Sequence, residues 1–182
     1  MTDSNRTLLY KKNLNILLSM NFEKYLFVLE LYSTYWDKKP IVEISLNNEH
    51  KIKQEIKDAY NKPTVIQFEH ICQNNTNYRL EINRSNKDDS QTVVSNNQIT
   101  KDQILHIKSI SIDHIDLNTL LYKGIYKPQY PKQWLREQIN HDIIVPEIIP
   151  KCLDLGHNGT WSFEFSAPFY DWWLLECDQN HD

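Results

Sequence analysis

The residues of this sequence that could do chemistry are few, and the best pattern is a set of histidines beside aspartates. His114 follows Asp113, and His141 precedes Asp142. Imidazole and carboxylate groups bind transition metals where they converge from different parts of a fold. The pattern therefore leaves open a metal-dependent hydrolase around His114, His141 and Asp142. This is the less favoured interpretation, because a chain with 7 histidines and 24 acidic residues produces such neighbours by chance.

Other common chemistries lack their residues. The three cysteines, Cys72, Cys152 and Cys177, are an odd number, lie far apart and form no CxxC pair. That usage is typical of reduced thiols in a cytoplasmic protein rather than of a disulfide scaffold or a zinc site. The three glycines form neither a P-loop nor a dinucleotide-binding fingerprint. We therefore predict no catalytic residue, no metal and no cofactor.

The charge of the chain is concentrated at its C-terminal end. The net charge is −4, but residues 152–182 carry −6 and contain no Lys or Arg, so the remaining 151 residues carry +2. Seven aromatic residues share this acidic segment. The side chains that we expect to contact a partner are Glu164, Asp171, Trp172, Trp173, Glu176 and Asp178.

An acidic, aromatic segment suits a basic protein partner. Aromatic residues are enriched at the centres of interfaces, and complementary charge accelerates and orients encounter. We therefore expect a non-enzymatic protein-binding module. Its most concrete form is a bacterial, cytoplasmic immunity protein or inhibitor that neutralises a basic toxin or nuclease. The alternative for the same aromatic residues is a place in the core.

A third interpretation is a small-ligand binding domain, with Trp36 and Trp161 as walls of a pocket inside a curved sheet. Two further classes are disfavoured. The acidic chain (pI about 6.0) lacks the excess of basic residues that nucleic-acid binding needs. No apolar run is long enough to span a membrane.

The elements that must position these residues form a single α+β domain over 1–182, with a largely antiparallel sheet built from hairpins. Ile52, Ile56 and Tyr60 recur at four-residue spacing on a charged segment, which favours an amphipathic helix. The predicted helices cover 4–21, 49–60 and 131–141.

Alternating apolar residues and turn signals predict the strands. Trp161, Phe163 and Phe165 indicate a half-buried strand. The phase of the isoleucines over 104–117 indicates either a bulge or a switch from helix to strand. The predicted hairpins join 25–36 to 42–46, and 64–72 to 78–82. The polar segment 83–98 is predicted to be a mobile loop, and 178–182 a disordered tail.

Overall fold

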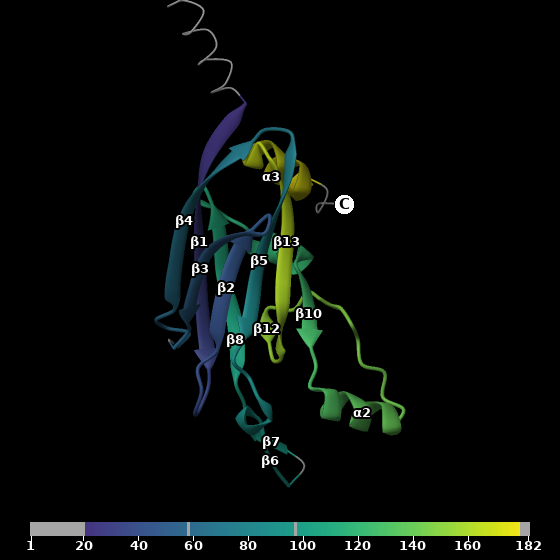
Figure 1. The fold of residues 1–182 in the computed structure, drawn as a ribbon. Helices are drawn as coiled ribbons and strands as arrows, with labels where there is room; N and C mark the ends of the chain where they lie inside the picture. Colours follow the sequence, from purple (N-terminus) through teal and green to yellow (C-terminus); the bar gives the residue numbers. More distant parts are fainter. Residues whose placement is uncertain (1–20, 58, 97, 179–182) are drawn as a thin grey trace, which may run out of the picture.

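The structure, a computed structural model, describes residues 21–57, 59–96 and 98–178. Two antiparallel sheets dominate it (Figure 1). The first contains, in spatial order, β12 (Asp154–Leu155), β8 (Ile104–Ile112), β1 (Phe22–Thr34) and β4 (Thr64–Gln73), with β9 (Ile115–Asp116) also on β8. The second contains β11 (Ile149–Pro150), β10 (Ile125–Gln129), β13 (Asn158–Ala167), β5 (Thr76–Ser85), β2 (Ile41–Leu46) and β3 (Glu49–Glu55).

The remaining elements are short. A separate hairpin pairs β6 (Val93–Ser95) with β7 (Gln98–Lys101). The helices of the described residues are the 3₁₀ turns η1 (Asp89–Gln91) and η2 (Asn118–Lys123), α2 (Lys132–Asn140) and α3 (Phe169–Asp178). The prediction of largely antiparallel sheet structure with a few helices is therefore confirmed. No helix in the described ranges is both long and apolar enough to cross a membrane.

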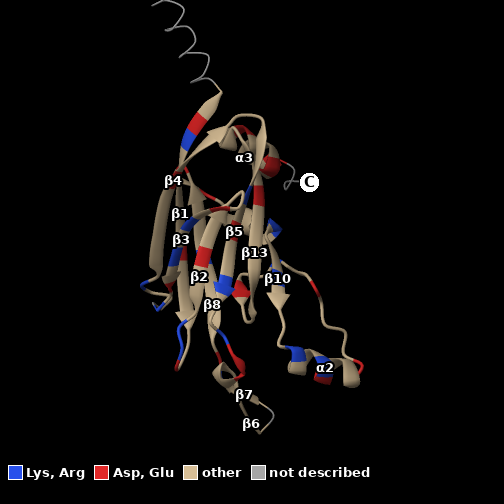
Figure 2. Cartoon of the chain, viewed as in Figure 1, with Lys and Arg blue, Asp and Glu red and all other residues tan. Residues whose placement is uncertain are grey.

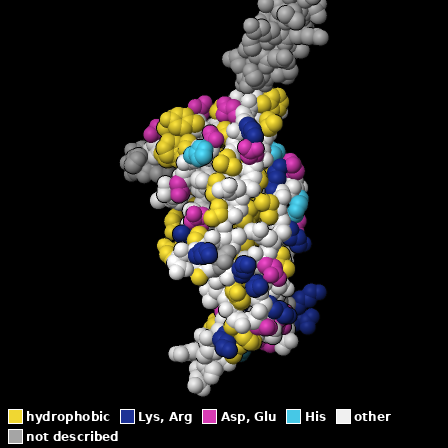
Figure 3. Space-filling model, turned by 90° about the vertical axis from the view of Figure 1, so that its left-hand side faces the viewer, with side chains coloured by type: hydrophobic (Ala, Val, Ile, Leu, Met, Phe, Trp, Pro, Cys, Tyr) yellow, Lys and Arg dark blue, Asp and Glu magenta, His cyan; other side chains and the backbone are white. Residues whose placement is uncertain are grey.

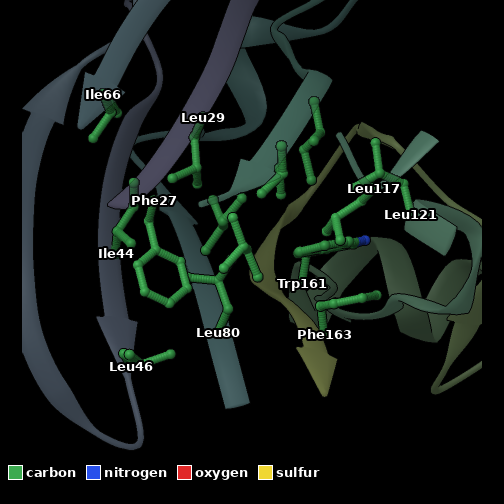
Figure 4. Close-up of a cluster of buried hydrophobic side chains, with 14 of the residues drawn as sticks. Phe27, Leu29, Ile44, Leu46, Ile66, Leu80, Leu117, Leu121, Trp161 and Phe163 are labelled. Atoms are coloured by element: carbon green, nitrogen blue, oxygen red, sulfur yellow. The ribbon is translucent and has the colours of Figure 1, made fainter. Parts of the chain in front are cut away.

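The core lies between the two sheets, where each strand turns its apolar face inward (Figure 4). Phe27 of β1 and Phe165 of β13 meet across the two layers, with ring centroids 5.9 Å apart. Trp161 and Phe163 are also buried, so the predicted half-buried strand at β13 is confirmed. Of the two alternatives predicted for 104–117, the bulge is the one that forms. Glu30 pairs with Ser109 and Leu31 with Ile107, which leaves one extra residue in β8.

The prediction of a helix over 49–60 is wrong, because this segment begins with strand β3. Asn47 and Asn48 both adopt positive φ angles, 49° and 66°, and connect β2 to β3 in a two-residue hairpin. Asparagine tolerates this conformation better than most residues, and two-residue hairpin loops require it. Ile52 and Ile56 still contact the core, but not from one face of a helix. Ile52 lies in β3, and Ile56 is the first residue after that strand.

The other two predicted helices have different outcomes. The helix over 4–21 lies outside the described residues, apart from its last position. Helix α2 lies within the range predicted for the third helix.

Neither predicted hairpin forms. β1 pairs with β4 and β8, whereas β2 pairs with β3 and β5. The chain therefore crosses from one sheet to the other between β1 and β2, and again between β4 and β5. Alternation indicates that one face of a strand is buried, and this holds equally for strands in facing sheets. The turn residues after β1 and β4 are compatible with a hairpin and equally with a connection to the facing sheet.

The two ends of the molecule differ. The β6–β7 hairpin and α2 both project from one end, and α3 lies at the opposite end (Figure 1). The segment 83–98 includes the last residues of β5, then η1, β6 and the first residue of β7. Its mobility stays a prediction, and the predicted tail falls almost entirely outside the described residues.

Candidate functional site: a cleft between the β6–β7 hairpin and helix α2

A cleft of about 640 Å³ opens between the two projections. Three segments that are distant in the sequence line it: 87–102, 129–137 and 156–158. Val94 and Ile99 supply exposed apolar side chains from the hairpin. Its polar and aromatic lining includes Lys87, Asp89, Asp102, Trp134, Glu137 and His157.

The floor of the cleft is an ion pair between Lys87 and Asp102. The Lys87 ammonium donates to Asp102 Oδ1 at 2.5 Å, to the Gly156 carbonyl at 2.6 Å and to the Gln103 carbonyl at 3.2 Å. All three of its protons are therefore used within the floor. Burial alone would raise the pKa of Asp102, but hydrogen bonds from Lys87 and Thr92 lower it below its ordinary value. Hydrogen bonds among these residues therefore hold the floor together.

A second buried cation supports this floor from beneath. Arg84 continues the inward face of β5 after Tyr78, Leu80 and Ile82, and its side chain is fully buried. Its Nη2 donates to the carbonyl oxygen of Gln103 at 2.9 Å and to the side-chain Oε1 of that residue at 2.5 Å. Burial lowers the pKa of Arg84 to about 10, so the guanidinium stays charged at neutral pH.

One wall of the cleft is aromatic. Tyr130 stacks on Trp134 with ring centroids 5.1 Å apart, and the His157 ring lies 5.3 Å from that of Trp134. The Tyr130 hydroxyl donates to the Pro146 carbonyl at 2.8 Å, which ties the segment after α2 to this wall. Burial, with the charges of Lys87 and Arg84, lowers the pKa of His157. The imidazole is therefore neutral at neutral pH.

We expect acidification to destabilise the protein through His157. The unfolded chain binds a proton near pH 6.5, whereas the folded chain resists it. The stability that neutral His157 contributes is thus complete above about pH 6.5 and falls as the pH drops towards the lower folded pKa. Urea unfolding at a series of pH values should show a smaller acid-induced loss in His157→Gln than in the parent. An equal loss in both would contradict this assignment. His70 accounts for part of the loss in both proteins, since burial and Lys51 lower its pKa too.

Carboxylates lie at the mouth of the cleft. Figure 2 shows acidic residues in red on the chain next to the β6–β7 hairpin and on α2. Asp88 is paired with Lys38. Asp89 and Glu137 form no ion pair with any described residue, although Glu137 accepts a hydrogen bond from Gln133 at 3.2 Å. Excess negative charge thus lies at the mouth, beside the apolar hairpin side chains and the indole of Trp134. This arrangement fits a long basic side chain, whose stem is apolar and whose head is cationic.

The residues predicted from the C-terminal charge lie on β13 and α3, at the other end of the molecule. Two of the carboxylates are paired with cations: Glu164 with Arg79, and Glu176 with Lys123. Asp171 and Asp178 are exposed on α3. The negative charge of this end is therefore partly neutralised within the fold.

The two tryptophans of this segment pack against the core. The ring of Trp172 lies 5.7 to 6.3 Å from those of Phe163, Phe165 and Phe169. Trp173 stacks on Tyr170 at 6.0 Å. Both indoles are half-buried, and the exposed apolar residues of α3 are instead Tyr170, Leu174 and Leu175.

The histidine–aspartate pattern does not assemble. His114 lies in the turn between β8 and β9, while His141 and Asp142 follow α2 at the opposite end of the sandwich (Figure 1). Among the described residues, no group of three or more His, Cys, Asp and Glu is arranged to hold a metal ion. The two tryptophans expected to form the walls of a ligand pocket, Trp36 and Trp161, lie in different environments. Trp161 is fully buried in the core, and Trp36 is 43% exposed beneath the ammonium of Lys101.

Sequence reasoning missed Asp89, Trp134, Glu137 and His157 as members of one site. A signal that could have pointed to this region is Arg84, a cation at an inward-facing position of an alternating strand, which requires buried polar partners. Comparison of the chain with protein-family models, with curated proteins and with solved structures found no match in any of the three.

Proposed function

We propose that this protein is a non-enzymatic binding module whose cleft receives a basic segment of a partner protein. The observation that carries the proposal is the pair of carboxylates, Asp89 and Glu137, that have no cationic partner among the described residues and share one cleft with Trp134. A Lys or Arg side chain entering there would meet two negative charges and an aromatic ring.

The floor supports a cationic rather than an anionic occupant. The ammonium of Lys87 is already used for three hydrogen bonds, and Arg84 is sealed beneath it, so neither cation is free to receive an anion. The network also keeps the cleft floor in place, because Lys87 Nζ and Arg84 Nη2 would lose buried hydrogen bonds if it rearranged. A preorganised cleft loses little conformational entropy on binding.

The concrete form of the proposal is an inhibitor or immunity protein that neutralises a basic toxin, such as a nuclease, in a bacterial cytoplasm. Enzymes that act on nucleic acid present basic surfaces to their substrate. An acidic cleft with an aromatic wall competes for the same surface by charge and shape. The proposed contact thus lies in the cleft and not on β13 and α3, where the sequence-based expectation placed it, and the expected partner is still basic.

The test uses a fluorescently labelled hexalysine peptide and the full-length protein. We expect the double variant D89N/E137Q to raise the dissociation constant about tenfold, which corresponds to roughly 0.7 kcal/mol for each lost charge pair. Binding to the parent should also weaken as the salt concentration rises, because exposed charges are screened. Fluorescence anisotropy measures both effects.

The matched control is D171N/D178N, which removes two exposed carboxylates from α3 and leaves the cleft unchanged. We expect peptide binding by this variant to equal that of the parent. If D171N/D178N weakens binding as much as D89N/E137Q does, the peptide responds to net charge and the cleft is not its site. If Trp134→Leu has no effect, the aromatic wall has no role in binding.

A further inference from the structure

The two edge strands on one side of the sandwich are protected to very different degrees. β3 carries Glu49, Lys51, Lys53 and Glu55, and charged side chains are a common device against edge-to-edge pairing. β4 has ten residues and a single acidic side chain, Glu69, with no proline, lysine or arginine. Figure 3 looks onto this side and shows hydrophobic side chains exposed between charged ones. β4 is therefore an edge open to a further strand.

The hydrogen-bonding groups of β4 that point outward can be identified from its pairing with β1. The Asn74 amide donates to the Asn21 carbonyl at 2.8 Å, and the register is regular from there to Thr64. Even-numbered residues of β4 therefore bond to β1, because in an antiparallel pair hydrogen-bonded positions alternate. The bond from Asp113 to Leu26 on the other side of β1 agrees with this parity. The odd-numbered residues direct their N–H and C=O groups to the open edge.

We infer that β4 pairs antiparallel with β4 of a second copy of this chain, about a two-fold axis at Phe68. In this register Val65 of each chain lies opposite Ile71 of the other, and Gln67 lies opposite Glu69. Val65 is 50% exposed and Ile71 62% exposed on the outer face, so the pairing covers both. Branched apolar residues in directly opposed positions stabilise paired strands.

The alternative registers are less favourable. Shifting the two-fold axis by one residue in one direction places Glu69 opposite Glu69, and like charges in opposed positions destabilise a sheet. The shift in the other direction places Val65 opposite Glu69. At the favoured axis the two Phe68 rings meet at a position without hydrogen bonds, where strands approach closest. Each Phe68 is half-buried and stacks on Phe27 with centroids 4.9 Å apart, so a second ring continues an existing stack.

Charged substitutions at the opposed pair test both the dimer and its register. Sedimentation of the full-length parent over a concentration series should show a monomer–dimer equilibrium. V65K/I71K places lysine opposite lysine twice, and we expect its dissociation constant to be at least tenfold higher. V65K/I71E places lysine opposite glutamate, and we expect the dimer to persist. Within one chain, Val65 adjoins Glu30 and Ile71 adjoins Lys24, so V65K/I71E also suits its own neighbours. Thermal melting confirms that both variants fold.

Amide hydrogen exchange of the unmodified protein gives a second readout. Raising the protein concentration should slow exchange at Val65, Gln67, Glu69 and Ile71, whereas the even-numbered amides of β4 should be protected at every concentration. A parent protein that remains monomeric at all concentrations overturns the inference. So does a dimer that survives V65K/I71K, or one that V65K/I71E disrupts equally, since either result means that another surface or register is used.

Discussion

Replacing Asp102 by Asn is expected to lower the free energy of unfolding by about 3 kcal/mol. The substitution keeps the size of the side chain and removes the carboxylate charge that faces Lys87. Two cations, Lys87 and Arg84, then remain beneath the cleft with no anion in the floor network. An unpaired buried charge costs far more than the net contribution of the pair itself, since its hydration is lost without compensation.

Urea unfolding followed by circular dichroism measures this effect, and we also expect a melting temperature about 6–12 °C lower. The control is Asp89→Asn, which makes the same chemical change at an exposed position of the same segment. We expect it to stay within about 0.5 kcal/mol of the parent. Equal stability of Asp102→Asn and Asp89→Asn would show that the floor does not depend on the charge of Asp102.

The carboxylate of Asp102 also makes stability depend on pH, but for a different reason and in a lower pH range than His157. The fold stabilises the charged form of Asp102 and the neutral form of His157. The pKa of Asp102 is lowered in the folded state, so its stabilising contribution is present above the ordinary carboxyl pKa of about 4. That contribution is lost as the pH falls through the folded value. Asp102→Asn should therefore flatten the stability profile below about pH 4, whereas His157→Gln should flatten it near pH 6.

Gly124→Ala is expected to destabilise the protein by at least about 3 kcal/mol, the upper part of the range for overpacking. A Cβ atom at position 124 would lie 2.2 Å from Cζ2 and 2.4 Å from Cε2 of Trp161. That indole is fully buried, so it cannot turn away into solvent. The backbone of Gly124 is in an extended conformation open to any residue, so the effect is one of volume alone.

Gly156→Ala is the matched control, because nothing lies within 4 Å of the Cβ position there. We expect its free energy of unfolding to stay within about 0.5 kcal/mol of the parent. If Gly124→Ala were equally harmless, the indole of Trp161 would have to have room to move, contrary to its burial. Near-ultraviolet circular dichroism reports the packing of the aromatic side chains, and Trp161 is one of five tryptophans that contribute.

The strands could be predicted from sequence better than their pairing. Alternation identified β13, and turn chemistry marked the ends of β1 and β4. Pairing depends on which of two facing sheets a strand enters, and alternation is the same in both. The prediction of a helix over 49–60 was wrong because it relied on the four-residue spacing of Ile52 and Ile56. The weaker signal was the correct one: two asparagines form the turn that connects β2 to β3.

The cleft could not be predicted, because its residues are distant in the sequence and close only in the folded structure. Asp89, Glu137 and His157 come from segments with no common pattern, and only the connections of the fold bring them together. The C-terminal charge is a true feature of the sequence, yet Arg79 and Lys123, which lie on other elements, pair with two of its carboxylates. A count of charges along the chain cannot include partners that the fold supplies.

The separation of α3 from the cleft has a practical consequence for identifying a partner. α3 lies at the end of the sandwich opposite the two projections (Figure 1). A fusion or a solid support joined after α3 would therefore leave the mouth of the cleft facing solution. Attachment through a cysteine introduced into α2 would block it. Comparing what the two orientations retain would show, without any change to the cleft residues, which end of the molecule a partner uses.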